Sequence, residues 1–188
     1  MKKFITILTL ALLVLTASAQ VQVQGLIGAN KKIVAEHSLA TEKIFAYSYL
    51  EATDAPGAYW QAIAEYNFWK LAAHVEYRTS FDGWRAAFAG ISYPVFSKHG
   101  MFSVSALARW EPGLITGQIG TCNSYDFGWI DLYGYTDLWY NDGVQFYWEQ
   151  RAYINLTKNI GVGFVLDTIF AERFYFTPYF GIRVRFGA

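Results

Sequence analysis

The segment from Phe174 to Phe186 alternates strictly between two kinds of residue. One row consists of Phe174, Phe176, Pro178, Phe180, Ile182, Val184 and Phe186, and the other of Tyr175, Thr177, Tyr179, Gly181, Arg183 and Arg185. Successive side chains of a β-strand point to opposite faces, so this pattern predicts a strand with one wholly apolar face. Soluble strands usually run about 5–6 residues, whereas a tilted strand that crosses a bilayer needs roughly 9–11. A strand of this length therefore favours a membrane-spanning sheet.

The composition supports the same fold class. Hydrophobic residues make up 54% of the chain and aromatic residues 19%, while charged residues reach only 16%, against about 25% in soluble domains. No run after residue 20 approaches 18 apolar residues, which excludes a bundle of membrane-spanning helices. A closed sheet satisfies every backbone polar group inside lipid. We therefore predict an all-β protein, a single antiparallel up-and-down transmembrane barrel.

The N-terminus has the pattern of an export signal. Met1-Lys2-Lys3 is basic, Phe4 to Leu15 is apolar, and Ala17-Ser18-Ala19 is a small-residue cleavage site. The apolar run is too short for a membrane anchor, so we predict a signal peptide over 1–19 and cleavage between Ala19 and Gln20. The barrel then occupies 20–188, with thirteen basic residues against fifteen acidic ones. This balance gives no case for nucleic-acid binding.

Turn residues divide the mature chain into twelve predicted strands. They are Val21–Ile27, Ile33–Leu39, Ile44–Leu50, Ala58–Trp69, Leu71–Thr79, Trp84–Tyr93, Phe102–Trp110, Leu114–Cys122, Trp129–Tyr140, Val144–Leu156, Ile160–Phe170 and Phe174–Phe186. Leu114–Cys122 is weakly patterned, and the alanines of Ala58–Trp69 also permit a helix. The barrel would have eight or ten strands if the weak segments are not real. A loop is expected over Pro94–Gly100, and turns at Asp54–Gly57 and Asn141–Gly143, while Ala171–Arg173 leads into the last strand. A soluble β-sandwich or lipocalin-like barrel is the alternative fold.

If the apolar rows face lipid, the polar rows face a lumen. The candidate lumen and solute-contact residues are Glu65, His74, Glu76, Arg78, Arg109, Asp131, Tyr135, Asp137, Trp139, Glu149, Arg151, Asp167, Arg183 and Arg185. Neighbouring strands lie about 4.8 Å apart, so the charges on the last four strands can pair across the ladder. Such a network either plugs and stabilises the barrel or lines a polar channel. In a channel, tyrosine and tryptophan rings can stack a planar solute.

A lipid-modifying enzyme is the hypothesis from a different class. Glu36-His37-Ser38 supplies triad residue types, but on a strand His37 faces away from its two neighbours. His74 and Glu76 share a face but lie about 7 Å apart along it, which predicts no direct bond. The three histidines have no metal-ligand spacing, so we expect no metal, no cofactor and no enzymatic activity. Cys122, the single cysteine, has no intrachain disulfide partner.

Several motifs resemble those of known membrane proteins. Gly181-x-x-Val184-x-Phe186 resembles the C-terminal pattern of bacterial outer-membrane barrels, with Gly187 and Ala188 added. From about Ile33 to Phe186, the order of motifs resembles a family of small outer-membrane barrels of unknown function, itself similar to the nucleoside-specific (Tsx-like) channels. The motifs are Asn67-Phe68-Trp69-Lys70, His74-Val75-Glu76-Tyr77, Gly134-Tyr135-Thr136-Asp137-Leu138-Trp139 and Pro178–Phe186.

The resemblance implies twelve strands and passage of small solutes. We therefore expect a Gram-negative outer-membrane protein that forms a narrow channel for small polar, nucleoside-like solutes. Its expected partners are outer-membrane lipid and the barrel-assembly machinery, which would recognise the C-terminal strand. The alternatives are a plugged structural or interaction barrel without transport, and a lipid-modifying enzyme.

Overall fold

The fold was taken from a computed structural model of the chain, which describes residues 19–28, 30–53, 58–140, 143–170 and 174–186. The strands are β1 (Ala19–Gly28), β2 (Lys31–Ala40), β3 (Ile44–Thr53), β4 (Ala58–Phe68), β5 (Leu71–Ser80), β6 (Arg85–Ser97), β7 (Gly100–Glu111), β8 (Leu114–Asp126), β9 (Ile130–Tyr140), β10 (Val144–Asn155), β11 (Ile160–Phe170) and β12 (Phe174–Phe186). Among these residues, no helix is long and apolar enough to cross a membrane. The predicted signal peptide falls almost entirely on residues 1–18, outside the described part, and stays a prediction.

The described strands form one closed barrel. Each strand pairs antiparallel with its neighbours in the sequence, and β1 pairs with β12 from Val21 opposite Phe186 to Gly28 opposite Tyr179. The prediction of twelve strands is confirmed, and the alternatives of eight or ten strands are wrong. The helix permitted by the alanines of Ala58–Trp69 is also wrong, because this segment is β4 and carries Gln61 and Glu65 inward. Leu114–Cys122 is a real strand that continues to Asp126.

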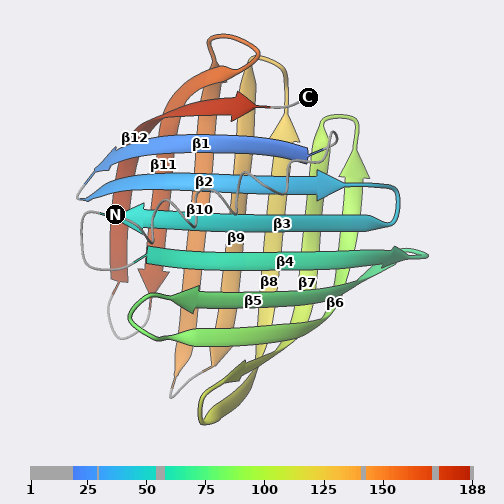
Figure 1. The fold of residues 1–188 in the computed structure, drawn as a ribbon. Coiled ribbons are helices and arrows are strands. Elements are labelled where there is room, and N and C mark those ends of the chain that lie inside the picture. Colours follow the sequence, from blue (N-terminus) through green and yellow to red (C-terminus); the bar gives the residue numbers. More distant parts are fainter. Residues whose placement is uncertain (1–18, 29, 54–57, 141–142, 171–173, 187–188) are drawn as a thin grey trace.

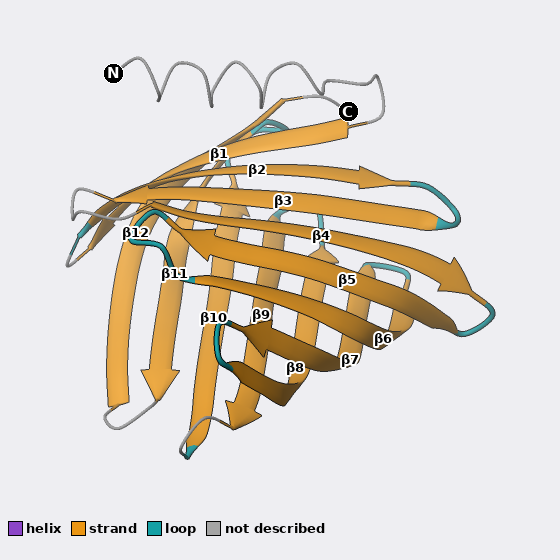
Figure 2. Cartoon of the chain, turned by 60° about the horizontal axis from the view of Figure 1, so that its bottom comes forward, coloured by secondary structure: helices purple, strands orange, loops and turns teal. Residues whose placement is uncertain are grey.

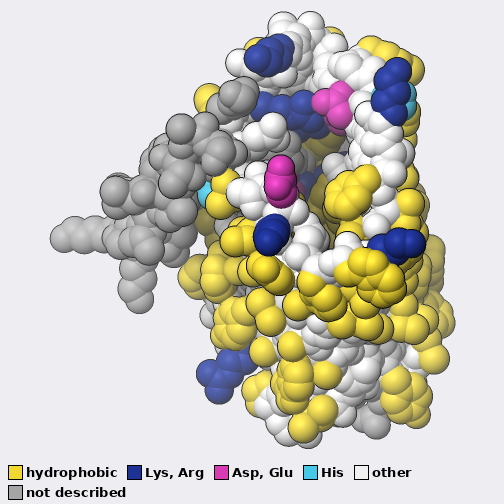
Figure 3. Space-filling view, turned by 90° about the vertical axis from the view of Figure 1, so that its right-hand side faces the viewer, with side chains coloured by type: hydrophobic (Ala, Val, Ile, Leu, Met, Phe, Trp, Pro, Cys, Tyr) yellow, Lys and Arg dark blue, Asp and Glu magenta, His cyan; other side chains and the backbone are white. Residues whose placement is uncertain are grey.

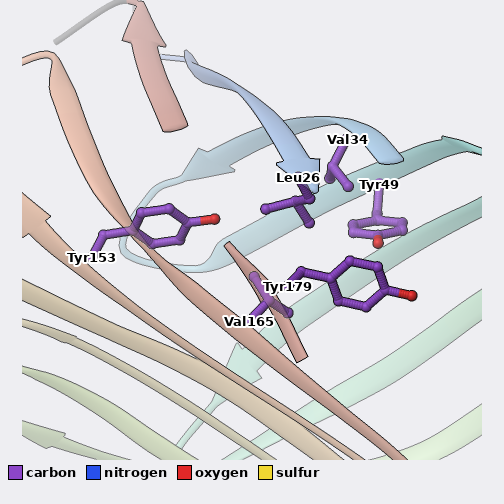
Figure 4. Close-up of a cluster of buried hydrophobic side chains, with 6 residues drawn as sticks. All are labelled: Leu26, Val34, Tyr49, Tyr153, Val165 and Tyr179. Carbon is purple, nitrogen blue, oxygen red and sulfur yellow. The ribbon is translucent and has the colours of Figure 1, made fainter. Parts of the chain in front are cut away.

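The barrel wall has two curved halves whose strands cross at a steep angle. In Figure 1, β1 to β6 run across the front, and β7 to β12 run behind them at a steep angle. Figure 2 shows the whole barrel turned by 60° about the horizontal axis. Inward side chains of six consecutive strands, from β10 across the β1–β12 seam to β3, pack together in the lumen. Leu26, Val34 and Tyr49 from the front half meet Tyr153, Val165 and Tyr179 from the back half in a buried cluster (Figure 4). The lumen is therefore partly filled by its own side chains.

Short connections join the strands at both ends. Gly83 and Gly113 have positive φ angles of 103° and 82° in the β5–β6 and β7–β8 turns, where glycine avoids a Cβ clash. Trp69 in the β4–β5 turn also has a positive φ, 57°, and is 90% exposed. The predicted turn at Asp54–Gly57, the segment Ala171–Arg173 and most of the predicted turn at Asn141–Gly143 lie outside the described residues.

The loop predicted over Pro94–Gly100 is wrong. β6 continues to Ser97, and Pro94 lies inside it, opposite Ser103 of β7. Proline has no N–H to donate, so it is tolerated in a sheet only where one side of the strand is unpaired. That condition holds here, because the ladder between β5 and β6 ends at Ser92. The connection to β7 is then a two-residue turn.

The outer surface is a belt of exposed apolar side chains. Ile33 on β2, Val75 on β5, Ile119 on β8 and Phe164 on β11 are each between 53% and 57% exposed. In a soluble protein such a continuous apolar surface is a liability, whereas in a barrel it is the lipid-facing band. The exterior therefore has the character of a membrane barrel and not of a soluble sandwich.

Candidate functional site

All fourteen candidate residues lie in the inward rows of their strands. Most are buried, from Arg151 at 1% to Arg78 at 9% exposed, and Arg185 is the most open of the charged ones, with a side chain 28% exposed. The inward rows result from the period of two, which places polar residues of one strand on a single face. These residues therefore face the interior of the barrel, and their role in lining a channel or contacting a solute stays a prediction.

Arg151 lies at the centre of the first charged cluster. Its Nη1 donates to Glu36 Oε1 at 2.6 Å, and its Nε donates to Glu149 Oε1 at 2.6 Å. Tyr47 Oη and Gln24 Nε2 donate to Glu36 at 2.6 Å and 2.7 Å. Buried charges need such partners, because an unpaired charge in a low dielectric is costly.

A second cluster is centred on Arg78. Its Nε donates to Glu76, and its Nη1 donates to Asp137 Oδ2 at 2.6 Å. His74 connects Glu76 to Glu65, with 3.3 Å from Nε2 to Glu76 Oε2 and 2.8 Å from Nδ1 to Glu65 Oε1. Glu65 lines the cavity at one end of the barrel, so the cluster reaches inward from there.

The second cluster continues toward the opposite end. Gln118 Nε2 donates to Asp137 Oδ1 at 2.9 Å, and Arg109 Nη1 donates to Gln118 Oε1 at 3.1 Å. Arg109 then pairs with Glu111, the last residue of β7, and its guanidinium lies 4.4 Å from the ring centroid of Trp139. Polar side chains thus connect one end of the lumen to the other.

Two further groups of charges complete the lumen. Lys32 Nζ lies 2.7 Å from Asp167 Oδ2 and 3.3 Å from Glu51 Oε1. Arg183 and Arg185 both donate to Asp131 Oδ2. Acids and bases therefore neutralise one another along most of the lumen.

The expected pairing across the ladder is wrong for these charges. Arg183 on β12 pairs with Asp131 on β9, although β10 and β11 lie between them in the wall, and Asp167 pairs with Lys32 on β2. The ladder partner of Asp167 on β10 is Glu149, another acid. Long inward side chains thus reach between strands that lie three places apart around the wall, and the strand pattern does not report that.

The expected separation of His74 and Glu76 is wrong as well. Their side chains come within 3.3 Å although they are two positions apart on β5. The distance of about 7 Å applies to backbone positions, and two long side chains on one face can lean toward each other. Glu76 and Arg78 bond in the same way.

Sequence reasoning missed several lumen residues. Lys32, Glu51, Gln24 and Gln118 all enter the polar clusters, and Glu36 was considered only as part of a triad. A signal was present on β2, because its even positions Lys32, Val34, Glu36 and Ser38 alternate with apolar residues and His37. On β3, the inward row contains Tyr47 and Tyr49, whose aromatic rings made this face look as apolar as the outward one in the sequence.

A cavity opens at the end where β1 begins and β12 ends. It holds about 990 Å³, and its lining includes Gln20, Thr41, Asn67, Asp126 and Lys158. We call this cavity the vestibule. Figure 3 looks from the side of the β2–β3 turn onto a hollow with side chains of both charges around it. A smaller cavity of about 80 Å³ is lined by Gln61, Arg78 and Asp137, and Cys122 lines both. The space therefore narrows toward the Arg78 cluster.

The arrangement of His74 does not match a nucleophile–base pair. Ser92 Oγ donates to Glu65 Oε1 at 2.9 Å, and both ring nitrogens of His74 are held by carboxylates. A hydrolase needs its serine bonded to the histidine. Among the described residues, no group of three or more His, Cys, Asp or Glu residues is arranged to hold a metal ion.

No protein-family model matches the sequence, and no curated protein is significantly similar to it. Solved structures of porins share the fold. A KdgM porin in complex with disordered oligogalacturonate has a TM-score of 0.63 and 8% identity, covering 89% of this chain and 99% of that one. The NanC porin has a TM-score of 0.61 and 13% identity, covering 90% and 100%. At such identities the likeness establishes the fold, that of a small porin barrel. The relationship to nucleoside-specific channels stays a prediction.

Proposed function

We propose that this protein is an outer-membrane channel for the diffusion of small polar solutes, exported with a cleaved signal peptide. The vestibule is its entrance, and the ion pairs that cross the lumen form its constriction. The observation that carries the proposal is the polar path from Glu65 to Glu111, which runs through a barrel with an apolar exterior. A solute that moves along this path exchanges hydrogen bonds with water for hydrogen bonds with the wall.

Nucleoside-like solutes are the finer form of this proposal. Tyr47 and Tyr133 line the vestibule, and their rings are stacked with centroids 6.5 Å apart. A purine or pyrimidine can stack on such rings while carboxylates and amides bind the ribose hydroxyls. Oligogalacturonate, bound by the KdgM porin of the same fold, provides the contrasting class, an acidic saccharide.

Solute flux into liposomes that carry the refolded mature protein tests both forms. We expect nucleosides to enter faster than neutral sugars of similar size, and acidic saccharides to enter slowest. Asp137→Ala and Arg183→Ala should each change the permeability or its ion selectivity. Unchanged permeability in both variants would contradict the channel path. If folded, inserted wild-type protein passes no solute, the barrel is a plugged structure and the ion pairs serve only stability.

A further inference from the structure

The lipid-facing surface carries two carboxamides among its apolar side chains. On β10, the outward row reads Val144, Phe146, Trp148, Gln150, Ala152 and Ile154, so Gln150 interrupts an otherwise apolar row. On β8, Asn123 belongs to the same outward row as Ile115 and Ile119, which are 74% and 55% exposed. Both amides therefore face away from the lumen; Gln150 lies between Trp148 and Ala152 in its row, and Asn123 lies between Thr121 and Tyr125.

The two amides lie together over β9. Asn123 is opposite Gly134 in the ladder, and Gly134 is opposite Gln150. Asn123 Nδ2 lies 3.4 Å from Gln150 Oε1, and Gln150 Nε2 donates to the backbone oxygens of Tyr133 at 2.9 Å and Arg151 at 3.2 Å. A Cβ on Gly134 would lie 2.6 Å from Gln150 Oε1 and 2.8 Å from Asn123 Oδ1. The glycine therefore leaves room for both side chains to lie flat on the sheet.

Threonines extend this polar surface to the next row. Thr121 on β8 is opposite Thr136 on β9, and Thr136 is opposite Trp148. We call Thr121, Asn123, Gly134, Thr136 and Gln150 the polar notch. In the rest of the described wall, the polar residues in outward rows away from the strand ends are His37, Ser48 and Thr168. No other outward row of the described strands carries a carboxamide.

Hydrocarbon offers these groups no partner. A polar group moved into an apolar medium without a hydrogen bond costs several kcal/mol, and polar side chains inside membranes mark contacts between protein surfaces. The contact between Asn123 and Gln150 is long at 3.4 Å, so it leaves most of the capacity of the Asn123 amide available. A carboxamide carries both donors and acceptors, so a surface with two amides complements a second copy of itself.

We propose that the polar notch is the contact surface between two copies of this chain in the membrane, with the Asn123 and Gln150 amides of each copy bonding those of the other. Two copies inserted in the same direction and related by a two-fold axis along the membrane normal present the same patch to each other. The contact therefore needs only this chain and no second kind of protein. The dimer contact lies outside the barrel, so it is independent of passage through the lumen.

Disulfide crosslinking in lipid vesicles at a low protein-to-lipid ratio tests this contact. In a Cys122→Ser background, Thr136→Cys places a thiol inside the notch and leaves both amides intact. Ala64→Cys on β4 is the control, because Ala64 is a small outward residue that is more exposed than Thr136 and lies five strands away around the wall. We expect an oxidant to produce covalent dimers from Thr136→Cys and few from Ala64→Cys. Equal yields from the two positions would overturn the proposal.

Apolar substitutions of the amides supply the second measurement. Adding Asn123→Leu and Gln150→Leu to Thr136→Cys should lower the dimer yield at least tenfold, and Asn123→Gln alone should keep it. Leucine suits a lipid-facing position, so these variants should fold, and circular dichroism checks that they do. Subunit counting by single-molecule photobleaching should show dimers for the wild type and monomers for the double leucine variant. Monomers in both, or dimers in both, would refute the contact, whereas flux through the monomeric variant tests the channel separately.

Discussion

Arg151 on β10 and Glu36 on β2 form an ion pair across the lumen, with 2.6 Å between Nη1 and Oε1, although β1, β12 and β11 separate their strands around the wall. Both side chains are almost fully buried, at 1% and 3% exposed. The pair ties the front half of the barrel to the back half. It also occupies the space through which a solute would pass in the proposed channel, so the proposal makes stability and passage depend on the same residues.

Replacing Arg151 by methionine should destabilise the barrel by about 3–5 kcal/mol, because the change leaves Glu36 and Glu149 buried without their cation. Methionine keeps most of the volume, so the effect reports charge and not packing. Urea unfolding from lipid vesicles measures the change in free energy. The triple variant Glu36→Gln, Glu149→Gln, Arg151→Met removes all three charges and should recover most of the loss. A loss below about 1 kcal/mol in the single variant would show that water reaches the cluster.

Removing either partner of the Arg78–Asp137 pair should change the ion selectivity of the channel, in opposite directions for the two partners. Asp137→Ala leaves the Arg78 cation without this partner in the narrow part of the lumen, so the channel should shift toward anions. Arg78→Ala leaves the Glu76 and Asp137 carboxylates and should shift the channel toward cations. Reversal potentials in planar bilayers under a salt gradient measure both. Glu42→Gln, a charge change in the exposed β2–β3 turn, is the control. Shifts of the same sign in both variants would contradict a constriction at this pair.

The period of two predicted most of this fold. It identified twelve strands and their inward faces, because a membrane barrel requires alternation along each strand. The alternation pattern did not predict features that depend on contacts between different strands. The loop expected at Pro94 is a strand because β5 ends its pairing at Ser92, and a sequence does not report where a neighbouring ladder stops. The ion pairs join strands three or four places apart around the wall, and no single strand encodes which distant strands its side chains reach. Lys32 and Glu51 were missed for a local reason, because the predicted strands began at Ile33 and ended at Leu50, each one residue short of the charge.

Cys122 should report the width of the lumen by its reactivity. Its side chain lines both the vestibule and the smaller cavity. Small charged methanethiosulfonate reagents should therefore modify it in folded protein, whereas a bulky maleimide should react far more slowly. The neighbouring position gives a matched control, because Asn123→Cys in a Cys122→Ser background places the thiol on the lipid-facing side. Charged reagents should not reach that thiol in vesicles. Equal reaction at positions 122 and 123 would contradict the inward and outward rows of β8.

Gly163 should tolerate no side chain. A Cβ at this inward position of β11 would lie 1.9 Å from the backbone oxygen of Ala152 on β10, so the strand itself must move to accept one. Gly163→Ala should lower the free energy of unfolding by about 1–3 kcal/mol, the usual range for overpacking, and should lower the refolding yield in lipid. Gly25→Ala is the control, because a Cβ there meets nothing within 4 Å. Equal stability of the two variants would mean that β10 and β11 can separate without cost.

Phe186 should matter for assembly in the cell and little for the folded barrel. It ends β12 opposite Val21, at the seam where the barrel closes, and is 54% exposed on the outer face. If the assembly machinery reads the terminal aromatic residue, Phe186→Ala should reduce the folded protein in outer membranes several-fold. Phe180→Ala is matched in strand, face and exposure, at 60%, and should assemble normally. Both purified variants should refold into lipid vesicles with the same yield. Equal amounts of the two variants in cells would show that the terminal aromatic residue is not needed for assembly. A refolding defect confined to Phe186→Ala would show instead that Phe186 acts in closing the β1–β12 seam.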